Sequence, residues 1–476
     1  MYIECMSFLS TADRAILTAV SRLVYANPFL PERVDLERAI LGRAFVKGGP
    51  VWSIQVNDPE AERANVWAIA ARVEALVGKL HARIGSASPS DLSIYEDAVL
   101  HVLYQRYYLR LASAQGKWPF YKQFATDWSY YLGRLSCRGD AAHMFAIFHQ
   151  IQRAFRHIFS NIIGNSMPSA GLRASVWQSI FTHDMRRYRR TLFSRMGDFA
   201  TLITGPSGTG KELVASAIAH SRYVPFDPVR QSFAADESSF FHAINIAALS
   251  PTLIESELFG HMRGAFTGAM ADRRGWLEEC PALGSVFLDE LGELDASIQV
   301  KLLRVIETRT FQPVGSTASR RFHGKLIAAT NRDLAAEMRA GRFREDFYYR
   351  LCSDQNVTPP LRDQLNDLHD LILYMARRVA GEEGEPLAAE VEDYAANNLG
   401  KDYQWPGNYR ELEQCVRNVL IRKSYRPVAP IEKTNLSADE LITARCRAVF
   451  RETGSYAETA RRLALNWRTV KTRVTC

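Results

Sequence analysis

The spacing of apolar residues predicts a helical stretch over about the first 160 residues. Residues 64–80 (ANVWAIAARVEALVGKL) and 91–111 (DLSIYEDAVLHVLYQRYYLRL) contain no proline and repeat their apolar positions every three or four residues. This period places the apolar side chains on one face of an α-helix. Glycine and proline interrupt the pattern at 47–50 and 85–90, where we predict loops. We therefore expect a helical N-terminal domain at residues 1–160.

Aromatic residues are crowded between positions 101 and 160. In this segment 14 of 60 residues are aromatic, against 11% for the whole chain. Such crowding indicates either a thick aromatic core, which is the default, or a surface that binds a ligand or a neighbouring subunit. One row at three-four spacing could join this domain to the next one or to a partner helix. The row is Phe148, Ile151, Phe155, Ile158 and Ile162.

Near residue 162 the pattern changes to short β-rich runs that alternate with helical stretches. FATLITG and SVFLDE are each followed by a helical segment, and KLIAATN is a further strand-like run. This alternation is typical of a parallel sheet covered by helices. The turn-like TPPLRD at 358–363 then begins a helical region that extends to about residue 423. We expect an α/β subdomain at 161–364 and a helical one at 365–425.

A small basic domain follows a linker at the C-terminal end. RPVAP at 426–430 has the composition of a linker, which we place at 426–436, ahead of a domain at 437–476. These last 40 residues contain eight Lys or Arg and four Asp or Glu, so they carry much of the chain's net charge of +7. A positive excess permits a polyanionic partner without requiring one.

Composition restricts the class of protein. A chain of 476 residues, 47% hydrophobic and 23% charged, is globular and too long for one ordinary core. Its seven cysteines include no C-x-x-C pair, which favours buried thiols in a reducing compartment over a zinc site or disulfides. No apolar run approaches 18 residues, and no secretion signal opens the chain, so we expect a cytoplasmic protein outside the membrane.

Residues 201–212, TLITGPSGTGKE, have the pattern of a phosphate-binding loop between a strand and a helix. The glycines let the backbone wrap closely, so that N–H groups and the helix N-terminus face a phosphate chain. Lys211 adds charge at the β- and γ-phosphates, whereas Glu212 replaces the Ser or Thr that normally contacts Mg²⁺. A plain glycine turn is the alternative. The candidate residues are Gly205, Pro206, Ser207, Gly208, Thr209, Gly210, Lys211 and Glu212.

Polar residues end two further predicted strands. In SVFLDE, Asp289 suits Mg²⁺ and Glu290 can polarise a water that attacks the γ-phosphate. In KLIAATN, Thr330 and Asn331 can contact the γ-phosphate or that water. The alternatives are a strand that ends in exposed acids and an ordinary strand-terminal turn.

Two arginines in GRFREDFYYRL, Arg344 and Arg350, have two interpretations. They can form surface pairs with Glu345 and Asp346, which contribute little to stability. They can instead reach the γ-phosphate bound to a neighbouring subunit and stabilise its transition state.

The hexapeptide GAFTGA at 264–269 fits neither a strand nor a helix, because no apolar period of 2 or 3.6 is present. Its glycines, Gly264 and Gly268, indicate a bent or hinged loop that carries Phe266 and Thr267. The alternative is a buried glycine turn with Phe266 in the core.

Together these motifs resemble the bacterial enhancer-binding proteins, AAA+ ATPases that activate RNA polymerase carrying sigma-54. The resemblance rests on GPSGTGKE, ESELFGH, GAFTGA, FLDELGEL, AATNRDL, FREDFYYRL and WPGNYRELE, and extends from about residue 162 to 422. It implies that the hexapeptide loop contacts sigma-54 and moves with the state of bound ATP and Mg²⁺. The loop residues are Gly264, Ala265, Phe266, Thr267, Gly268 and Ala269.

The resemblance also implies roles around the nucleotide. Ile163 in IIGNS lies in the segment that borders the adenine. Asn245 matches the asparagine that holds the catalytic glutamate, here Glu290, in a nucleotide-dependent switch. Arg410 matches sensor II on the helical lid, and Glu212 is typical of the family.

Further roles concern catalysis between subunits. Thr330 and Asn331 match sensor I, and Arg344 and Arg350 match arginine fingers that act in trans. Arginine fingers of this kind imply a homo-hexameric ring, with a dimer as the alternative inactive state. Two features depart from the family: the connection at 222–240 is longer than usual, and residues 1–160 show no phospho-acceptor aspartate pattern.

The C-terminal residues 453–474 resemble a Fis-like helix-turn-helix. Ala457, Ala460 and Leu463 can pack the first helix against Trp467 and Val470 of the second. The second helix would enter the major groove of double-stranded DNA, with bases contacted by Arg468 and Thr469 and phosphates by Lys471 and Arg473. A solvated pair of basic helices is the alternative. Because the chain ends soon after, we expect dimerisation to support this helix.

The sequence as a whole predicts a multidomain sigma-54-dependent activator. Its parts are a helical N-terminal regulatory domain, an α/β AAA+ phosphate-loop core with a parallel sheet and helical lid, and a C-terminal helix-turn-helix bound to upstream DNA. The DNA contact would raise the effective concentration of the ring near its promoter. The alternatives are an AAA+ remodeller of another client and a DNA-binding regulator that does not hydrolyse ATP.

Overall fold

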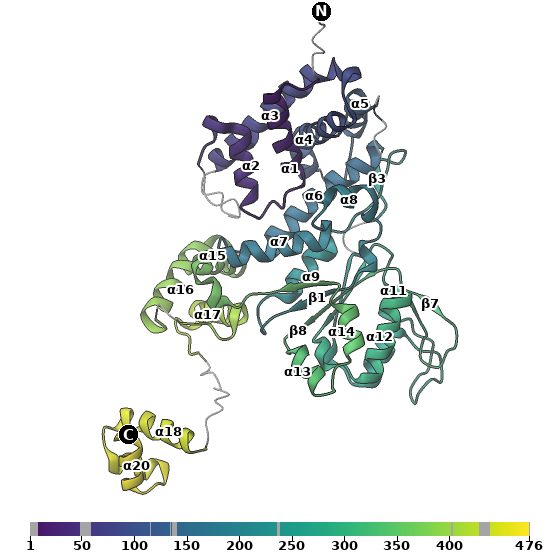
Figure 1. Cartoon of the computed structure of the whole chain (residues 1–476). Coiled ribbons are helices and arrows are strands. Elements are labelled where there is room, and N and C mark those ends of the chain that lie inside the picture. The colour runs from purple at the N-terminus through teal and green to yellow at the C-terminus, as the bar shows by residue number, and fades with distance from the viewer. Residues whose placement is uncertain are drawn as a thin grey trace, which may run out of the picture. The chain divides into compact units, whose positions relative to one another are not determined.

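The computed structural model describes residues 8–47, 59–114, 116–133, 135, 140–235, 239–400, 403–427 and 438–475. The chain divides into two compact units, Met1–Tyr425 and Arg426–Cys476 (Figure 1). Three of the sequence predictions lie mostly or wholly outside the described residues: the loop at 47–50, the linker at 426–436, and the burial of Cys5, Cys137 and Cys476. In the described part of the chain, no helix combines the length and apolar character that crossing a membrane requires.

The N-terminal region is helical, as predicted. It contains α1 (Thr11–Tyr25), α2 (Glu32–Leu41), α3 (Pro59–His81), α4 (Pro89–Ser113), α5 (Tyr121–Leu132) and α6 (Ala141–Asn161). Side-chain caps begin several of these helices: Ser88 accepts a hydrogen bond from the Asp91 N–H, and Asp140 accepts one from the His143 N–H. The crowded aromatic residues build the core here, where Phe124 and Phe145 are fully buried.

The first strand begins later than the change of pattern near residue 162 indicated. Helix α7 (Met167–Phe181) follows α6, then α8 (Met185–Arg187) and a π-helical turn (Tyr188–Leu192) precede β1 (Thr201–Thr204). Helix α7 escaped the sequence analysis because both of its faces are buried, which removes the amphipathic period.

A parallel sheet forms the centre of the middle region, which confirms the prediction. Its order is β4-β5-β8-β1-β9, and neighbouring strands within it pair in parallel. The strands are β1, β4 (Phe241–Asn245), β5 (Ser285–Asp289), β8 (Lys325–Thr330) and β9 (Asp354–Val357). The surrounding helices are α9 (Lys211–His220), α10 (Pro251–Phe259), α11 (Trp276–Glu279), α12 (Ala296–Thr308), α13 (Leu334–Arg339) and α14 (Glu345–Leu351).

The register of the sheet places the polar strand ends along one edge. Asn245 lies opposite Asp289 on neighbouring strands, and Thr204 lies opposite Thr330. In parallel sheets this carboxyl edge is where ligands bind. Two short hairpins lie outside the sheet: β2 (Phe226–Asp227) with β3 (Ser232–Phe233), and β6 (Thr310–Phe311) with β7 (Arg320–Arg321).

A helical lid follows the sheet, as predicted. A 3-10 segment (Leu361–Asp367) leads into α15 (Leu368–Ala380), α16 (Gly384–Asn398) and α17 (Asn408–Arg422). Its separate core includes Ile372, Val391, Trp405 and Leu412.

The second unit contains α18 (Ala438–Thr453), α19 (Tyr456–Leu463) and α20 (Trp467–Thr475). Its core joins Cys446 of α18 to Ala460 and Val470. The predicted packing of Ala457 and Trp467 between α19 and α20 is wrong: Ala457 is exposed, and Trp467 is 51% exposed. The reason is α18, which the sequence analysis did not assign and which packs on both following helices.

Candidate nucleotide site and partner loop

The phosphate loop needs glycine for space as well as for backbone conformation. Gly205 and Gly208 both have positive φ, at +148° and +78°. A Cβ on Gly205 would lie 2.2 Å from Thr358 Oγ1 at the end of β9, and one on Gly208 would lie 2.5 Å from the Gly407 carbonyl oxygen. The loop is therefore held closely between the sheet and the lid.

Lys211 is buried at the first position of α9. Its Nζ donates hydrogen bonds of 3.0 Å to the carbonyl oxygens of Gly205 and Pro206. Burial lowers the pKa of this ammonium, while the nearby Glu290 and Asp289 oppose the shift. Lys211 therefore interacts electrostatically with two acids that stand at the carboxyl end of β5.

Glu290 has a backbone conformation that is unusual for its residue type. It adopts φ +56° and ψ +44°, and its N–H donates to Asp289 Oδ1 at 2.9 Å. A left-handed conformation in a residue other than glycine costs free energy, and such residues cluster at functional sites. Asn245, opposite Asp289 on the neighbouring strand, is exposed at the same edge.

The two candidates for sensor I differ in their surroundings. Thr330 is fully buried, and its Oγ1 accepts the Arg332 N–H at 3.1 Å, as in an ordinary strand-terminal turn. Asn331 is exposed beside it. Of the two, Asn331 has the accessible side chain.

Arg344 and Arg350 form exposed ion pairs on the surface of the α/β region. Arg344 contacts both carboxylate oxygens of Asp346, at 3.0 and 2.6 Å, as one alternative proposed. Arg350 instead pairs with Glu307 of α12 at 3.0 Å. Exposed pairs of this kind contribute about 0–1 kcal/mol, so a stronger anionic partner could displace them.

The lid contacts the phosphate loop directly. Asn408 Nδ2 donates to the Ser207 carbonyl at 2.9 Å, and Arg410 Nη1 donates to Ser207 Oγ at 3.2 Å. Asn408 also accepts the Leu361 N–H at 2.8 Å and adopts φ +54°. Arg410 was predicted from the sequence and Asn408 was not, although asparagine after a WPG turn is a residue that tolerates the left-handed conformation.

The segment expected to border the adenine is joined to the lid by a buried carboxylate. Asp367 accepts the backbone N–H groups of Asn165 and Ser166, both at 2.6 Å, and the Ser169 hydroxyl at 2.6 Å. Ile163, in the same segment, packs against the lid core. No signal in the sequence identified Asp367, because its partners lie about 200 residues earlier in the chain.

The hexapeptide forms a surface loop closed by its own turns. Gly264 and Gly268 have φ of +80° and +100°, and a Cβ on either would meet nothing within 4 Å, so backbone conformation alone favours glycine there. The Phe266 ring is half-buried and contacts the His261 ring edge-on at 4.9 Å, whereas Thr267 is exposed. The hexapeptide is therefore not a buried turn with Phe266 in the core, and Phe266 is not fully exposed either.

The candidate DNA-contacting residues of α20 differ in their exposure. Arg468 lies over the Trp467 ring, and it and Lys471 are exposed, while Thr469 is half-buried. Arg473 is also half-buried, and its Nη1 donates to Thr443 Oγ1 of α18 at 2.9 Å. Arg473 therefore helps to hold α20 against α18.

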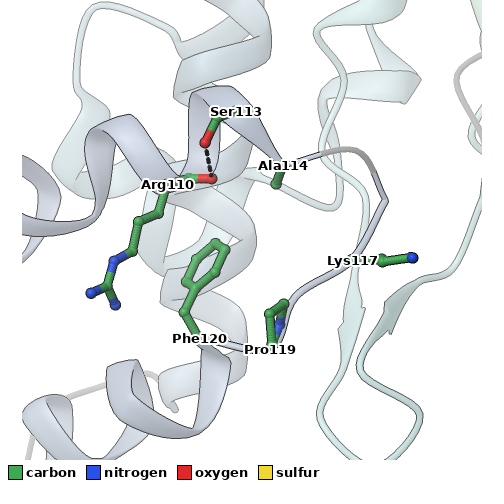
Figure 2. Close-up of a pocket in the computed structure, with 6 residues that line it drawn as sticks. All are labelled: Arg110, Ser113, Ala114, Lys117, Pro119 and Phe120. Atoms are coloured by element: carbon green, nitrogen blue, oxygen red, sulfur yellow. Dashed lines mark hydrogen bonds between the residues drawn. The ribbon is translucent and has the colours of Figure 1, made fainter.

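A surface hollow of about 350 Å³ lies among the N-terminal helices, away from the phosphate loop. Figure 2 shows Arg110 and Lys117 on its rim, pointing away from each other, with Phe120 between the helices. Its other lining residues are Ser113, Ala114 and Pro119.

Comparison with known proteins agrees with this geometry. Residues 181–355 match the family described as Sigma-54 interaction domain, and residues 362–438 match the AAA+ ATPase lid domain. The chain is 39% identical over 266 residues to the Nif-specific regulatory protein of Azotobacter vinelandii, covering 52% of this chain and 48% of that protein. It is 42% identical over 238 residues to the luminescence regulatory protein LuxO of Vibrio campbellii, covering 50% and 49%.

The chain spans about half the length of these curated relatives. Among solved structures, NtrX from Brucella abortus in complex with ATP aligns at a TM-score of 0.43 and 21% sequence identity, over 79% of this chain and 86% of that one.

Proposed function

The central region of this chain belongs to the Sigma-54 interaction domain family and continues into an AAA+ ATPase lid, and from this we propose its function. The proposed activity is the hydrolysis of ATP with Mg²⁺, coupled to the remodelling of closed complexes of RNA polymerase with sigma-54. The observation that carries it is the convergence of three elements on one edge of the sheet: the phosphate loop, the Asp289–Glu290 strand end and the lid's Arg410.

The donor groups present fit a nucleoside triphosphate with its Mg²⁺. Backbone N–H groups of the glycine loop and the Lys211 ammonium suit phosphate oxygens, and the Asp289 carboxylate suits Mg²⁺. Bound ATP supplies the phosphoanhydride bond. Glu290 orients a water and accepts its proton, and Asn245 and Asn331 position these polar groups at the strand ends. Arg410, Thr330 and the Ile163 segment hold the lid and loops around them.

We assign the working assembly to a homo-hexameric ring, with a dimer as its inactive form. Arg344 and Arg350 support this, because both guanidinium groups lie on the surface, where they pair with exposed acids. In a ring they reach the γ-phosphate on the neighbouring subunit, and their loss would leave that phosphate without its charge partner in the transition state.

The flanking regions complete the proposal. Residues 1–160 form a regulatory domain, residues 161–364 and 365–425 the ATPase and its lid, and 437–476 a helix-turn-helix after the 426–436 linker. The exposed Arg468 and Lys471 on α20 support binding to upstream double-stranded DNA. The exposed Thr267 and the glycine-flanked Phe266 support contact with sigma-54.

Substitution of Glu290 tests the core of the proposal. Glu290→Gln keeps the side chain's shape and removes the base, so the variant should bind ATP with unchanged affinity and lose hydrolysis by at least about 100-fold. Open-complex formation by sigma-54 polymerase should disappear with it. A Glu290→Gln variant that hydrolyses ATP at the wild-type rate would remove Glu290 from this role and contradict the assignment.

A further inference from the structure

The segment 222–240 is longer than the connection found in the resembling family, and the structure shows what its described part contacts. Between α9 and β4 the chain forms the β2–β3 hairpin, in which Phe226 lies opposite Phe233. The Asp227 carboxylate accepts the N–H groups of Val229 and Arg230, which fixes the turn. At the turn, Val229 is 90% exposed, so the tip is in solvent and the two phenylalanines at the base of the hairpin face inward.

Both phenylalanines are inserted among aromatic residues of the N-terminal helices. The Phe226 ring lies 4.7 Å from the Tyr121 ring and 4.8 Å from the Phe145 ring. The Phe233 ring lies 4.9 Å from Trp118 and stacks on His149 at 4.2 Å. Ring contacts at these separations add attraction to the burial of apolar surface. The hairpin is therefore an arm of the ATPase region held by α5, α6 and the connection before α5.

Polar contacts from α6 hold the beginning of this arm, where α9 ends. Gln150 Nε2 donates to the Ser221 carbonyl at 2.9 Å, and Arg153 donates to the Arg222 carbonyl. The His143 ring nitrogen Nδ1 is hydrogen-bonded to the Tyr223 hydroxyl at 2.9 Å.

Arg153 also reaches the end of the arm, where the chain enters β4. Its guanidinium lies over the Phe240 ring, 5.4 Å from the ring centre. One side chain of the N-terminal domain thus contacts the chain on both sides of the insertion. The first side is continuous with α9, which begins at Lys211, and the other with β4, which ends at Asn245.

We propose that residues 222–235 and 239–240 are a clamp through which the N-terminal domain restrains the ATPase, by fixing α9 and β4 relative to each other. The inference rests on the proposed ATPase function and assigns its regulation. The proposed catalytic site uses Lys211 at the start of α9 and Asn245 at the end of β4. Movement of the elements around a catalytic site sets the turnover rate of many enzymes. With the clamp docked, that movement must pull Phe226 and Phe233 out of their aromatic surroundings. A signal that loosens α5 and α6 releases the restraint.

The test uses the full chain and compares Phe233→Ala, at the half-buried anchor, with Val229→Ala, at the exposed tip of the same hairpin. Coupling between protein sites is typically about 5- to 150-fold, so Phe233→Ala should raise the basal ATPase rate by about 5-fold or more. Val229→Ala should leave it unchanged. An unchanged or lower rate in a folded Phe233→Ala variant, judged by its thermal transition, overturns the proposal.

If Phe233→Ala lowers the temperature of the thermal transition, a milder substitution tests the same restraint. Tyr223→Phe removes only the hydroxyl that pairs with His143, so it should raise the rate in the same direction by a smaller factor. A Tyr223→Phe rate at or below that of the wild type would contradict the restraint.

Hydrogen exchange separates this proposal from the proposed ATPase function, because it needs no hydrolysis. Faster amide exchange in β4 and at residues 221–223 of Phe233→Ala, with exchange in α15–α17 unchanged, is the expected result. Unchanged exchange in β4 overturns the clamp even if the chain hydrolyses ATP. If the wild-type chain has no ATPase activity but Phe233→Ala still shows faster exchange in β4, the proposed function is contradicted and the clamp is supported.

Discussion

The backbone N–H of Tyr409, at the start of α17, donates a hydrogen bond of 3.0 Å to the carbonyl oxygen of Gly208 in the phosphate loop. The lid is thereby hydrogen-bonded to the loop itself. Asn408 Nδ2 donates a second bond to the loop, to the Ser207 carbonyl oxygen. Asn408 Oδ1 accepts the Leu361 N–H at the base of the lid. Lid position and phosphate-loop conformation therefore change together.

Asn408→Ala should destabilise the chain by about 2–4 kcal/mol. The substitution leaves the buried Leu361 N–H without its acceptor, which costs about 1–3 kcal/mol, and forces alanine into a left-handed conformation. Denaturant unfolding with separate probes of the lid measures it. Asn418→Ala, at a partly exposed position of the same helix, is the matched control and should change stability by less than about 0.5 kcal/mol. Equal effects at the two positions would contradict the role given to Asn408.

Asp367→Asn should weaken ATP binding several-fold and leave kcat within about twofold. The carboxylate accepts two backbone N–H groups and the Ser169 hydroxyl, which an amide with one acceptor oxygen cannot satisfy equally. The segment containing Ile163 then loses its fixed position, and the affinity falls. ATP titration and steady-state kinetics separate the two quantities. Asp363→Asn, at an exposed residue of the same segment, is the control, and a loss confined to kcat would oppose the prediction.

Thr267→Ala should spare ATP hydrolysis and abolish open-complex formation. Thr267 is exposed on its loop, so loss of its hydroxyl does not disturb the core but removes a group from the proposed contact with sigma-54. The control is Met270→Ala, just outside the hexapeptide, where the side chain is 86% exposed. If Thr267→Ala supports normal transcription from a sigma-54 promoter, the client is a different protein.

Arg350→Ala should lower ATP hydrolysis by about 10³-fold or more without changing stability by more than about 1 kcal/mol. Its ion pair with Glu307 is exposed, so folding depends little on it. Glu307→Gln removes the same pair while keeping the arginine, and should retain hydrolysis. In the proposed ring the arginine acts on the neighbouring subunit, so mixing Arg350→Ala with Glu290→Gln subunits should restore part of the activity. Equal losses in Arg350→Ala and Glu307→Gln would indicate a structural role for the pair.

The sequence predicted the features that local patterns encode. The glycine loop, the acids at the end of β5 and the turns of the hexapeptide each depend on neighbours a few residues away, and the parallel sheet followed from strands that alternate with helices. Contacts between distant segments were not predictable in this way. Asp367 meets Asn165, and Phe233 meets His149, only once the chain is folded. The wrong prediction for Trp467 has the same cause. Ala460 and Val470 pack with Cys446 of α18, whereas Trp467 is exposed.

The stability of the N-terminal region should decrease as the pH falls from about 6.5 to about 4, in part because of His101. Burial, with a smaller contribution from Arg33, lowers the pKa of His101 to about 4. The His101 Nε2 atom is buried and has no hydrogen-bond partner among the described residues. The unfolded chain takes up a proton near pH 6.5, whereas the folded chain resists it until about pH 4, so acid favours unfolding. The contribution amounts to at most about 3 kcal/mol. The unfolding free energies of the wild type and His101→Phe, measured at pH 7 and pH 5, isolate this contribution. The decrease in unfolding free energy between the two pH values should be smaller in the variant. His183 is exposed, so His183→Phe should show the same decrease as the wild type. An unaltered decrease in His101→Phe would show that other groups cause the acid sensitivity.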